Sequence, residues 1–87
     1  MGYKITWSRQ ARRHFLGLDK SAQKRVSGLV DKLAEEPRPA AVKALVGMPG
    51  VLRIRTGDYR VLYSVDDGKR EIWIEDVRHR SKAYGGH

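Results

Sequence analysis

The sequence predicts an α+β domain in which an N-terminal strand and a two-helix hairpin precede a three-stranded antiparallel meander. The helices are expected to pack on one face of a small, mainly antiparallel sheet. Two observations predict this order: apolar residues recur at helical spacing in the first half of the chain and alternate with polar residues in the second half. A third is the length of 87 residues, which suits one modest core and predicts a single domain over residues 1–87.

The chain begins with a predicted strand and a predicted helix. Tyr3, Ile5 and Trp7 alternate with polar residues, which is typical of a half-buried strand. Ser8 follows, and its side-chain oxygen can cap the first turn of a helix. The apolar positions of this helix are Ala11, Phe15 and Leu18.

A second helix is predicted after Asp19 or Ser21, since either residue can serve as its N-cap. Its apolar residues are spaced to form one face and are Ala22, Val26, Leu29, Val30 and Leu33. Pro37 and Pro39 end the helix. Residues 37–50 are expected to form a loop with a turn at residues 47–50.

From residue 51 onward the pattern predicts three strands joined by tight turns. The strands are expected at residues 51–56, 59–66 and 69–78. Two-residue hairpin turns are expected at Gly57-Asp58 and Asp67-Gly68. Turn length fixes the register of a hairpin, so these turns also predict which side chains face each other.

This register separates the meander into an apolar face and a basic face. The apolar face, which is expected to meet the helices, carries Leu52, Ile54, Tyr59, Val61, Tyr63, Val65, Ile72 and Ile74. The opposite face carries Arg53, Arg55, Arg60, Leu62, Trp73 and Glu75. Arg55 would lie opposite Arg60, an arrangement in which like charges repel. The basic face is therefore either a cradle for phosphate or a solvated surface on which Glu75 neutralises Arg60.

The end of the chain adds further polar candidates. Continued alternation would turn Arg78 toward the core and His79 toward the basic face, next to Arg80. A strand end can also twist either side chain toward solvent, so their orientation stays open. His79 has the side-chain chemistry for acid–base work near neutral pH, whereas His14 lies on a helix among arginines and reads as incidental. Tyr84 can stack on a base or donate its hydroxyl group.

Charge predicts a polyanionic partner. Lys and Arg total 18 against 10 Asp and Glu, which gives a net charge of +8. Nucleic acid is the first expectation, followed by an anionic membrane and an acidic protein. The absence of Cys excludes disulfides, thiolate metal sites and cysteine nucleophiles, and no segment holds the roughly 20 apolar residues of a membrane helix.

Three segments resemble the RelE/ParE superfamily of bacterial toxins, and its RelE branch most of all. They are Gly47-Met48-Pro49, the YRVLY strand at residues 59–63, and the HR…Y pattern that runs from His79 to Tyr84. The resemblance covers nearly the whole chain, including the element order. It implies a microbial-ribonuclease-like fold and a type II toxin that cleaves messenger RNA in the ribosomal A site without metal or cofactor.

The resemblance also implies roles for individual residues. Arg60 matches the family's arginine in the YR strand, Arg78 its arginine before the tail, and Tyr84 its terminal tyrosine. The expected catalytic residues are Arg53, Arg60, Arg78, His79 and Tyr84. The expected RNA-binding residues are Lys43, Arg55 and Arg80. Val51 stands where some members carry a second lysine, and His79 where some carry an acidic residue, so the proton acceptor stays open between Tyr84 and His79.

Two other functions fit the same sequence. ParE-like toxins share the fold and bind DNA gyrase without being enzymes, although they generally lack the arginine–tyrosine set. An inactive toxin that only binds RNA or antitoxin is the third reading. The expected partners are a RelB-like antitoxin, in a toxin–antitoxin hetero-oligomer, together with the ribosome and messenger RNA. No membrane partner is expected, and the expected location is the cytoplasm.

Overall fold

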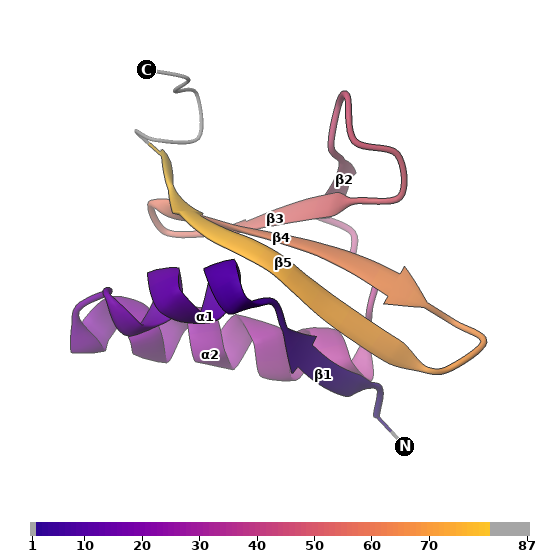
Figure 1. The fold of residues 1–87 in the computed structure, drawn as a ribbon, viewed down its shortest axis with the longest axis horizontal. Helices are drawn as coiled ribbons and strands as arrows, with labels where there is room; N and C mark the ends of the chain where they lie inside the picture. The colour runs from indigo at the N-terminus through magenta and orange to yellow at the C-terminus, as the bar shows by residue number, and fades with distance from the viewer. Residues whose placement is uncertain (1, 81–87) are drawn as a thin grey trace.

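The structure, a computed structural model, describes residues 2–80. Its elements are β1 (Lys4–Trp7), α1 (Arg9–Leu16), α2 (Lys20–Glu35), β2 (Lys43–Ala44), β3 (Leu52–Thr56), β4 (Tyr59–Asp66) and β5 (Glu71–His79). The strands form one sheet in the order β1-β5-β4-β3-β2, in which only the β1–β5 pair is parallel. Both helices lie on the same side of this sheet (Figure 1). The predicted α+β architecture is therefore confirmed.

Each helix begins at a side-chain cap. The backbone N–H of Ala11 donates to Ser8 Oγ over 3.0 Å, and that of Ala22 donates to Asp19 Oδ1 over 2.8 Å. Asp19, and not Ser21, is therefore the residue that caps α2. Neither helix of the described residues is long and apolar enough to span a membrane.

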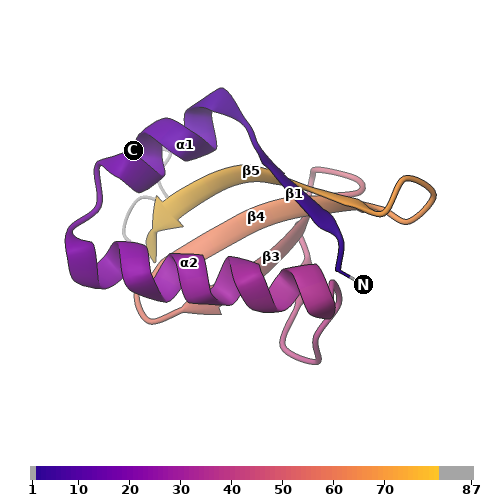
Figure 2. The same cartoon turned by 90° about the horizontal axis from the view of Figure 1, so that it is seen from below.

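The core lies between the two helices and the sheet. Figure 2, which views the molecule from the helix side, shows α1 beside β5 and α2 running along the sheet toward β3 and β4. The central cluster consists of Ala11, Val26, Val30, Leu33, Ile54, Val61, Tyr63, Ile72, Ile74 and Val77. Every residue of the predicted apolar face belongs to this cluster or packs against it, so that assignment is confirmed.

The predicted loop at residues 37–50 contains a strand that the sequence did not reveal. β2 pairs antiparallel with β3, with Lys43 opposite Arg53. The turn at residues 47–50 is confirmed and connects the two strands, with φ angles of 87° at Gly47 and 82° at Gly50 that favour glycine. A two-residue strand is too short to show an alternating pattern, which is why the sequence predicted only a loop.

The predicted two-residue turn between β4 and β5 is wrong. Four residues, 67–70, separate Asp66 from Glu71, which face each other at the strand ends. In this turn the Lys69 N–H donates to Asp66 Oδ1 over 3.0 Å. Arg70 adopts the left-handed backbone conformation, with a φ of 53°. Ile74 therefore faces Tyr63 instead of Val61. This shift of two residues leaves each side chain on its predicted face, because strand side chains alternate with a period of two.

A β-bulge then changes the faces at the end of β5. Tyr63 faces Ile74 and Leu62 faces Asp76, so Glu75 is an extra residue in β5. The predicted pairing of Arg60 with Glu75 is consequently wrong. Beyond the bulge the alternation is reversed: Val77 enters the core, Arg78 takes the face opposite the helices, and His79 takes the core-facing side. This is the opposite of the orientation that unbroken alternation would give Arg78 and His79, which the sequence left open.

Ser8 connects the start of α1 to this bulge. Its hydroxyl donates to the carbonyl oxygen of Glu75 over 2.8 Å while accepting the cap hydrogen bond from Ala11. Its backbone N–H donates to the carbonyl oxygen of Ile74 over 2.9 Å. One small side chain therefore serves both the helix cap and the irregular backbone of β5.

We expect Ser8→Ala to lower the free energy of unfolding by about 1–2 kcal/mol, because the variant loses a helix cap and leaves the Glu75 carbonyl without its donor. Urea denaturation measures this quantity. Ser27→Ala, at an exposed position within α2, is the matched control and should change stability by less than about 0.5 kcal/mol. Equal effects of the two substitutions would contradict the double role of Ser8.

Candidate nucleic-acid interface

Three arginines form a row across the face of the sheet that points away from the helices. Arg55 on β3 faces Arg60 on β4, and Arg60 also faces Arg78 on β5. Facing positions on neighbouring strands place their Cβ atoms about 4.5–5.5 Å apart. The bulge is what adds Arg78 to this row, which we call the arginine row.

A second row of positions lies next to the arginine row on the same face. Lys43 on β2 faces Arg53 on β3, which faces Leu62, and Leu62 faces Asp76. Lys43 was expected in a loop, but the short strand β2 fixes it beside Arg53. Figure 1 shows the connection between β2 and β3 rising from the sheet on the side opposite the helices.

These cations surround a cavity of about 450 Å³. Its lining residues are Ala41, Lys43, Arg53, Ile54, Arg55 and Arg60, with no acidic residue among them. Arg53 and Arg60 are partly buried, whereas Lys43 and Arg55 are exposed. We call this cavity the cationic cavity. This lining contains two predicted RNA-binding residues, Lys43 and Arg55. It also contains two of the predicted catalytic arginines, Arg53 and Arg60.

The electrostatics of this surface favour an anion. Unit charges 4 Å apart repel by about 1 kcal/mol in bulk water and by more where protein excludes solvent. Guanidinium groups also match phosphate geometry, because their planar forks bind two oxygens at once. A phosphodiester placed among these side chains therefore relieves repulsion and gains charge-assisted hydrogen bonds.

A buried carboxylate lies at the β5 end of the same face. Asp76 is 3% exposed and accepts hydrogen bonds from Arg78 Nε at 2.7 Å, Gln10 Nε2 at 2.8 Å and His14 Nδ1 at 2.6 Å. Burial alone would raise the pKa of Asp76, but these bonds and one from the Val77 N–H outweigh it and hold the pKa below its ordinary value. Asp76 is therefore an ionised acceptor next to the arginine row.

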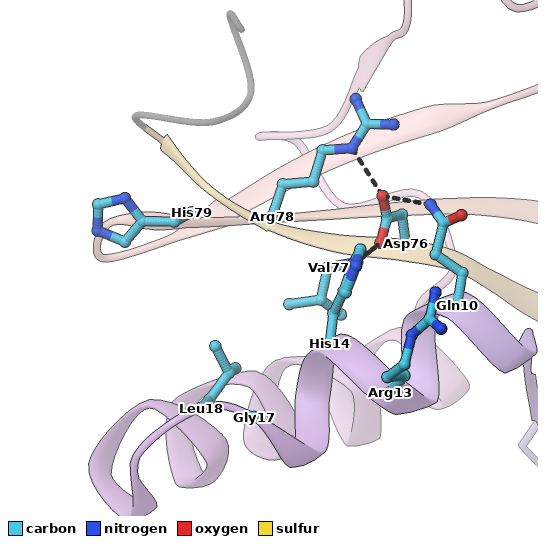
Figure 3. Close-up of a pocket in the computed structure, with 9 residues that line it drawn as sticks. All are labelled: Gln10, Arg13, His14, Gly17, Leu18, Asp76, Val77, Arg78 and His79. Carbon is cyan, nitrogen blue, oxygen red and sulfur yellow. Dashed lines mark hydrogen bonds and ion pairs between the residues drawn. The ribbon is translucent and has the colours of Figure 1, made fainter. Parts of the chain in front are cut away.

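A second cavity, of about 550 Å³, opens between α1 and the end of β5 (Figure 3). Its lining residues are Gln10, Arg13, His14, Gly17, Leu18, Asp76, Val77, Arg78 and His79. Figure 3 shows the Asp76 carboxylate between the helix side chains and Arg78. Arg78 therefore borders this cavity and also completes the arginine row.

The other predicted site residues lie apart from the arginine row. His79 takes the opposite side of the sheet, where its ring meets that of Tyr59 edge-on at 5.2 Å. Arg80 is exposed next to the β3–β4 turn, with Nη1 3.9 Å from Asp58 Oδ1. Glu75, which would neutralise Arg60 if the face were only a solvated surface, instead accepts a hydrogen bond from Ser64 over 2.9 Å. Tyr84 lies outside the described residues.

The site residues expected from the sequence did not include Asp76, Gln10 and His14. Gln10 and His14 are spaced i, i+4, so they share one helix face, but that spacing alone does not indicate a carboxylate partner. Asp76 reaches them because the bulge reverses the alternation of β5. In residues 2–80 no three His, Cys, Asp or Glu side chains are grouped so as to hold a metal ion.

Several solved structures that this chain resembles are complexes of a toxin with its antitoxin. The toxin–antitoxin complex RelBE2 from Mycobacterium tuberculosis matches with a TM-score of 0.81 and 29% identity, covering 92% of this chain and 100% of that one. The archaeal RelE–RelB complex from Pyrococcus horikoshii matches with a TM-score of 0.80 and 31% identity, covering 94% and 99%. The intact Escherichia coli RelBE complex matches with a TM-score of 0.78 and 24% identity, covering 88% and 95%, and so supports the fold.

The fold is thus that of RelE-like toxins. Residues 5–84 match the family described as the ParE toxin of the type II toxin–antitoxin system, parDE. The chain belongs to this family, within the RelE/ParE superfamily that the sequence predicted, and is a toxin of a type II toxin–antitoxin system. Comparison with curated protein sequences gave no match.

The lowered pKa of Asp76 leads to a prediction about acid stability. A carboxylate with a depressed folded-state pKa stabilises the fold above its unfolded-state pKa of about 3.9, and that contribution is lost as the pH falls. We expect Asp76→Asn to cost about 2 kcal/mol near neutral pH and to flatten the decline in stability as the pH falls below about 5. Urea titrations at a series of pH values measure both effects.

Asp67→Asn is the matched control for this measurement. Hydrogen bonds from Arg38 and Tyr3 lower the pKa of Asp67, but its ion pair with Arg38 is exposed and screened by salt. We expect a smaller change that vanishes in 1 M salt. An acid profile that Asp76→Asn leaves unaltered would show that the Asp76 network contributes nothing to the pH dependence.

Proposed function

We propose that this toxin is an endoribonuclease that acts on the ribosome and cleaves messenger RNA in the A site. The observation that carries the proposal is the arginine row, with the cationic cavity beside it on the same open face. Paired strands hold these side chains more firmly than loops would. A ribonuclease that works without metal needs such preorganised positive charge.

The reaction we propose is transesterification within the RNA chain. The ribose 2′-oxygen attacks the adjacent phosphorus atom, its proton passes to a base, and the bond to the 5′-oxygen breaks as that oxygen takes up a proton. A 2′,3′-cyclic phosphate and a 5′-hydroxyl group result. Arg60 and Arg78 stabilise the charge that develops on the phosphate oxygens, and Arg53, Arg55 and Lys43 bind the flanking backbone.

The proton transfers belong to other residues. Arginine is a poor proton donor, because its pKa exceeds about 12. His79 occupies the core-facing side of β5, on the other side of the sheet from Arg60. Tyr84, which matches the terminal tyrosine of the family, is therefore the base that we propose. Because the ribosome aligns the substrate, the toxin needs few residues that transfer protons.

The proposed partners follow from the relatives. The two relatives at 29% and 31% identity are the toxin–antitoxin complex RelBE2 and a RelE–RelB complex. We extend this to the present chain: a RelB-like antitoxin neutralises it in a hetero-oligomer, and an acidic or amphipathic antitoxin suits its net charge of +8. The proposed site of action, the ribosome, places the toxin in the cytoplasm.

Inhibition of DNA gyrase is the second candidate function. The observation that favours it is the match of residues 5–84 to the ParE toxin family. A gyrase inhibitor has no need for guanidinium groups aligned on one phosphate. The arginine row therefore favours the nuclease over the gyrase inhibitor.

We expect the double variant Arg60→Ala with Arg78→Ala to lose growth arrest and messenger RNA cleavage, by at least about 100-fold, because it removes the charge that stabilises the transition state. Induced expression in bacteria and cleavage of ribosome-bound transcripts measure the two losses, and thermal melting checks the fold. The pair Arg9→Ala with Arg12→Ala, at exposed positions of α1, removes the same charge and should stay fully toxic. Toxicity that survives in the folded Arg60 and Arg78 variant would refute the proposal.

Mapping of transcript ends after induction separates the candidate functions. The nuclease should produce new 5′ ends in register with codons within minutes. A gyrase inhibitor should instead block supercoiling by purified gyrase and leave transcripts intact. An inactive toxin should bind RNA with a steep salt dependence and produce neither effect.

A further inference from the structure

Asp76 is the buried charged side chain of the described residues, and all of its acceptor capacity is used. Oδ1 accepts from His14 Nδ1 at 2.6 Å and from the Val77 N–H at 2.8 Å. Oδ2 accepts from Gln10 Nε2 at 2.8 Å and from Arg78 Nε at 2.7 Å. A carboxylate offers about four lone-pair sites, so these donors saturate it. Asp76 therefore has no site left with which to bind substrate or to take a proton from it.

The donors come from two parts of the molecule with different roles. Gln10 and His14 belong to α1, which packs on β5. Because an ionised carboxylate only accepts, the proton between His14 and Asp76 resides on His14 Nδ1. Arg78 is the single donor from the arginine row, so Asp76 connects the helix to that row.

Asp76 contacts Arg78 through Nε and not through the outer edge of the guanidinium group. Figure 3 shows the two terminal nitrogens of Arg78 directed away from Asp76 and from α1. A contact at Nε stops rotation of the long side chain and leaves its terminal edge for a ligand. An arginine side chain carries about 2 kcal/mol of rotamer entropy, so fixing it before substrate arrives lowers the cost of using it.

Repulsion within the row makes such a restraint necessary. Arg60 faces Arg78 directly, and like charges at facing positions push the two side chains apart. The Arg78 side chain is 40% exposed, so it has room in solvent to adopt other conformations. The hydrogen bond from Arg78 Nε to the Asp76 carboxylate holds Arg78 in the arginine row against this repulsion.

We propose that Asp76, held by Gln10 and His14 of α1, is a positioning residue that fixes Arg78 in the arginine row for phosphate binding in the transition state. The inference rests on the proposed nuclease function of that row. Asp76 acts through Arg78 and touches no substrate atom.

The proposal predicts opposite signs for binding and for catalysis. Asp76→Asn removes a negative charge next to a cationic surface, which by itself tightens RNA binding. Loss of the restraint on Arg78 should nevertheless slow the chemical step, since small misplacements of catalytic groups cost up to about 100-fold. We expect Asp76→Asn to lower kcat about 10- to 100-fold, with KM unchanged or lower.

A double-mutant cycle measured on ribosome-bound transcripts tests the mechanism. Asp76→Asn should slow cleavage in the wild-type background and have no further effect in the Arg78→Ala background, because it acts only through Arg78. Asp67→Asn, which removes the exposed partner of Arg38, is the matched control and should leave kcat unchanged. Equal losses from Asp76→Asn in both backgrounds, or an unchanged kcat, would overturn the proposal.

Substitutions of His14 test the helix side of the network without altering β5. His14→Asn keeps an N–H donor near the position of Nδ1 and should retain most of the activity. His14→Leu removes the donor and should reproduce part of the Asp76→Asn defect. Equal activity of these two variants would argue against a contribution of α1 to the positioning.

An NMR measurement separates failure of this proposal from failure of the proposed function. The ¹⁵N relaxation of the Arg78 Nε–H should report a rigid group in the wild-type toxin and a mobile group in Asp76→Asn, with thermal melting showing that both are folded. If the wild-type toxin does not cleave RNA, the nuclease function fails, while a loss of rigidity still supports positioning. Equal rigidity in the two proteins rejects positioning whatever the toxin does.

Discussion

β5 contains one residue more than its pairing with β4 requires, and the composition of the basic face depends on that residue. Tyr63 and Leu62 are consecutive in β4, but their partners Ile74 and Asp76 are not, so Glu75 lies between the pairs. Regular alternation would have turned Arg78 into the core and Val77 onto the open face. With the bulge, Val77 is 3% exposed and belongs to the core cluster, and Arg78 stands opposite Arg60.

Repulsion between the facing arginines destabilises the sheet, whereas burial of the apolar side chains on its other face stabilises it. The arginine row lies directly beside a row of core residues, in which Ile54 faces Val61 and Val61 faces Val77. Burying each aliphatic side chain stabilises the fold by about 1.5–3 kcal/mol. Each pair of facing arginines costs less than about 1 kcal/mol. The apolar row on one face therefore outweighs the repulsion on the other, and the strands stay paired without an anion.

Sequence reasoning succeeded where one local pattern decides the structure. Caps and periodicity located both helices, and the Gly57-Asp58 turn fixed the β3–β4 register, including Arg55 opposite Arg60. The sequence did not predict the parts of the structure that contacts between distant residues decide. The bulge at Glu75 is held by Ser8, whose position beside β5 follows from the parallel β1–β5 pairing. No local pattern encodes that contact, so the sequence left the orientations of Arg78 and His79 open and did not reveal the Asp76 network.

The fold alone does not distinguish a nuclease from a gyrase inhibitor, because one scaffold can carry both functions. The contacts of Arg78 favour the proposed nuclease. A basic surface that binds a protein partner can tolerate mobile arginines, because partner contacts are spread over many residues. This surface instead places one arginine on a buried, saturated carboxylate, and anchors that carboxylate to a helix on the other side. Such a restraint is useful where one guanidinium group must meet one phosphate at a fixed position, which is the requirement of catalysis. The Asp76 network thus supports the nuclease for a reason independent of the number of positive charges.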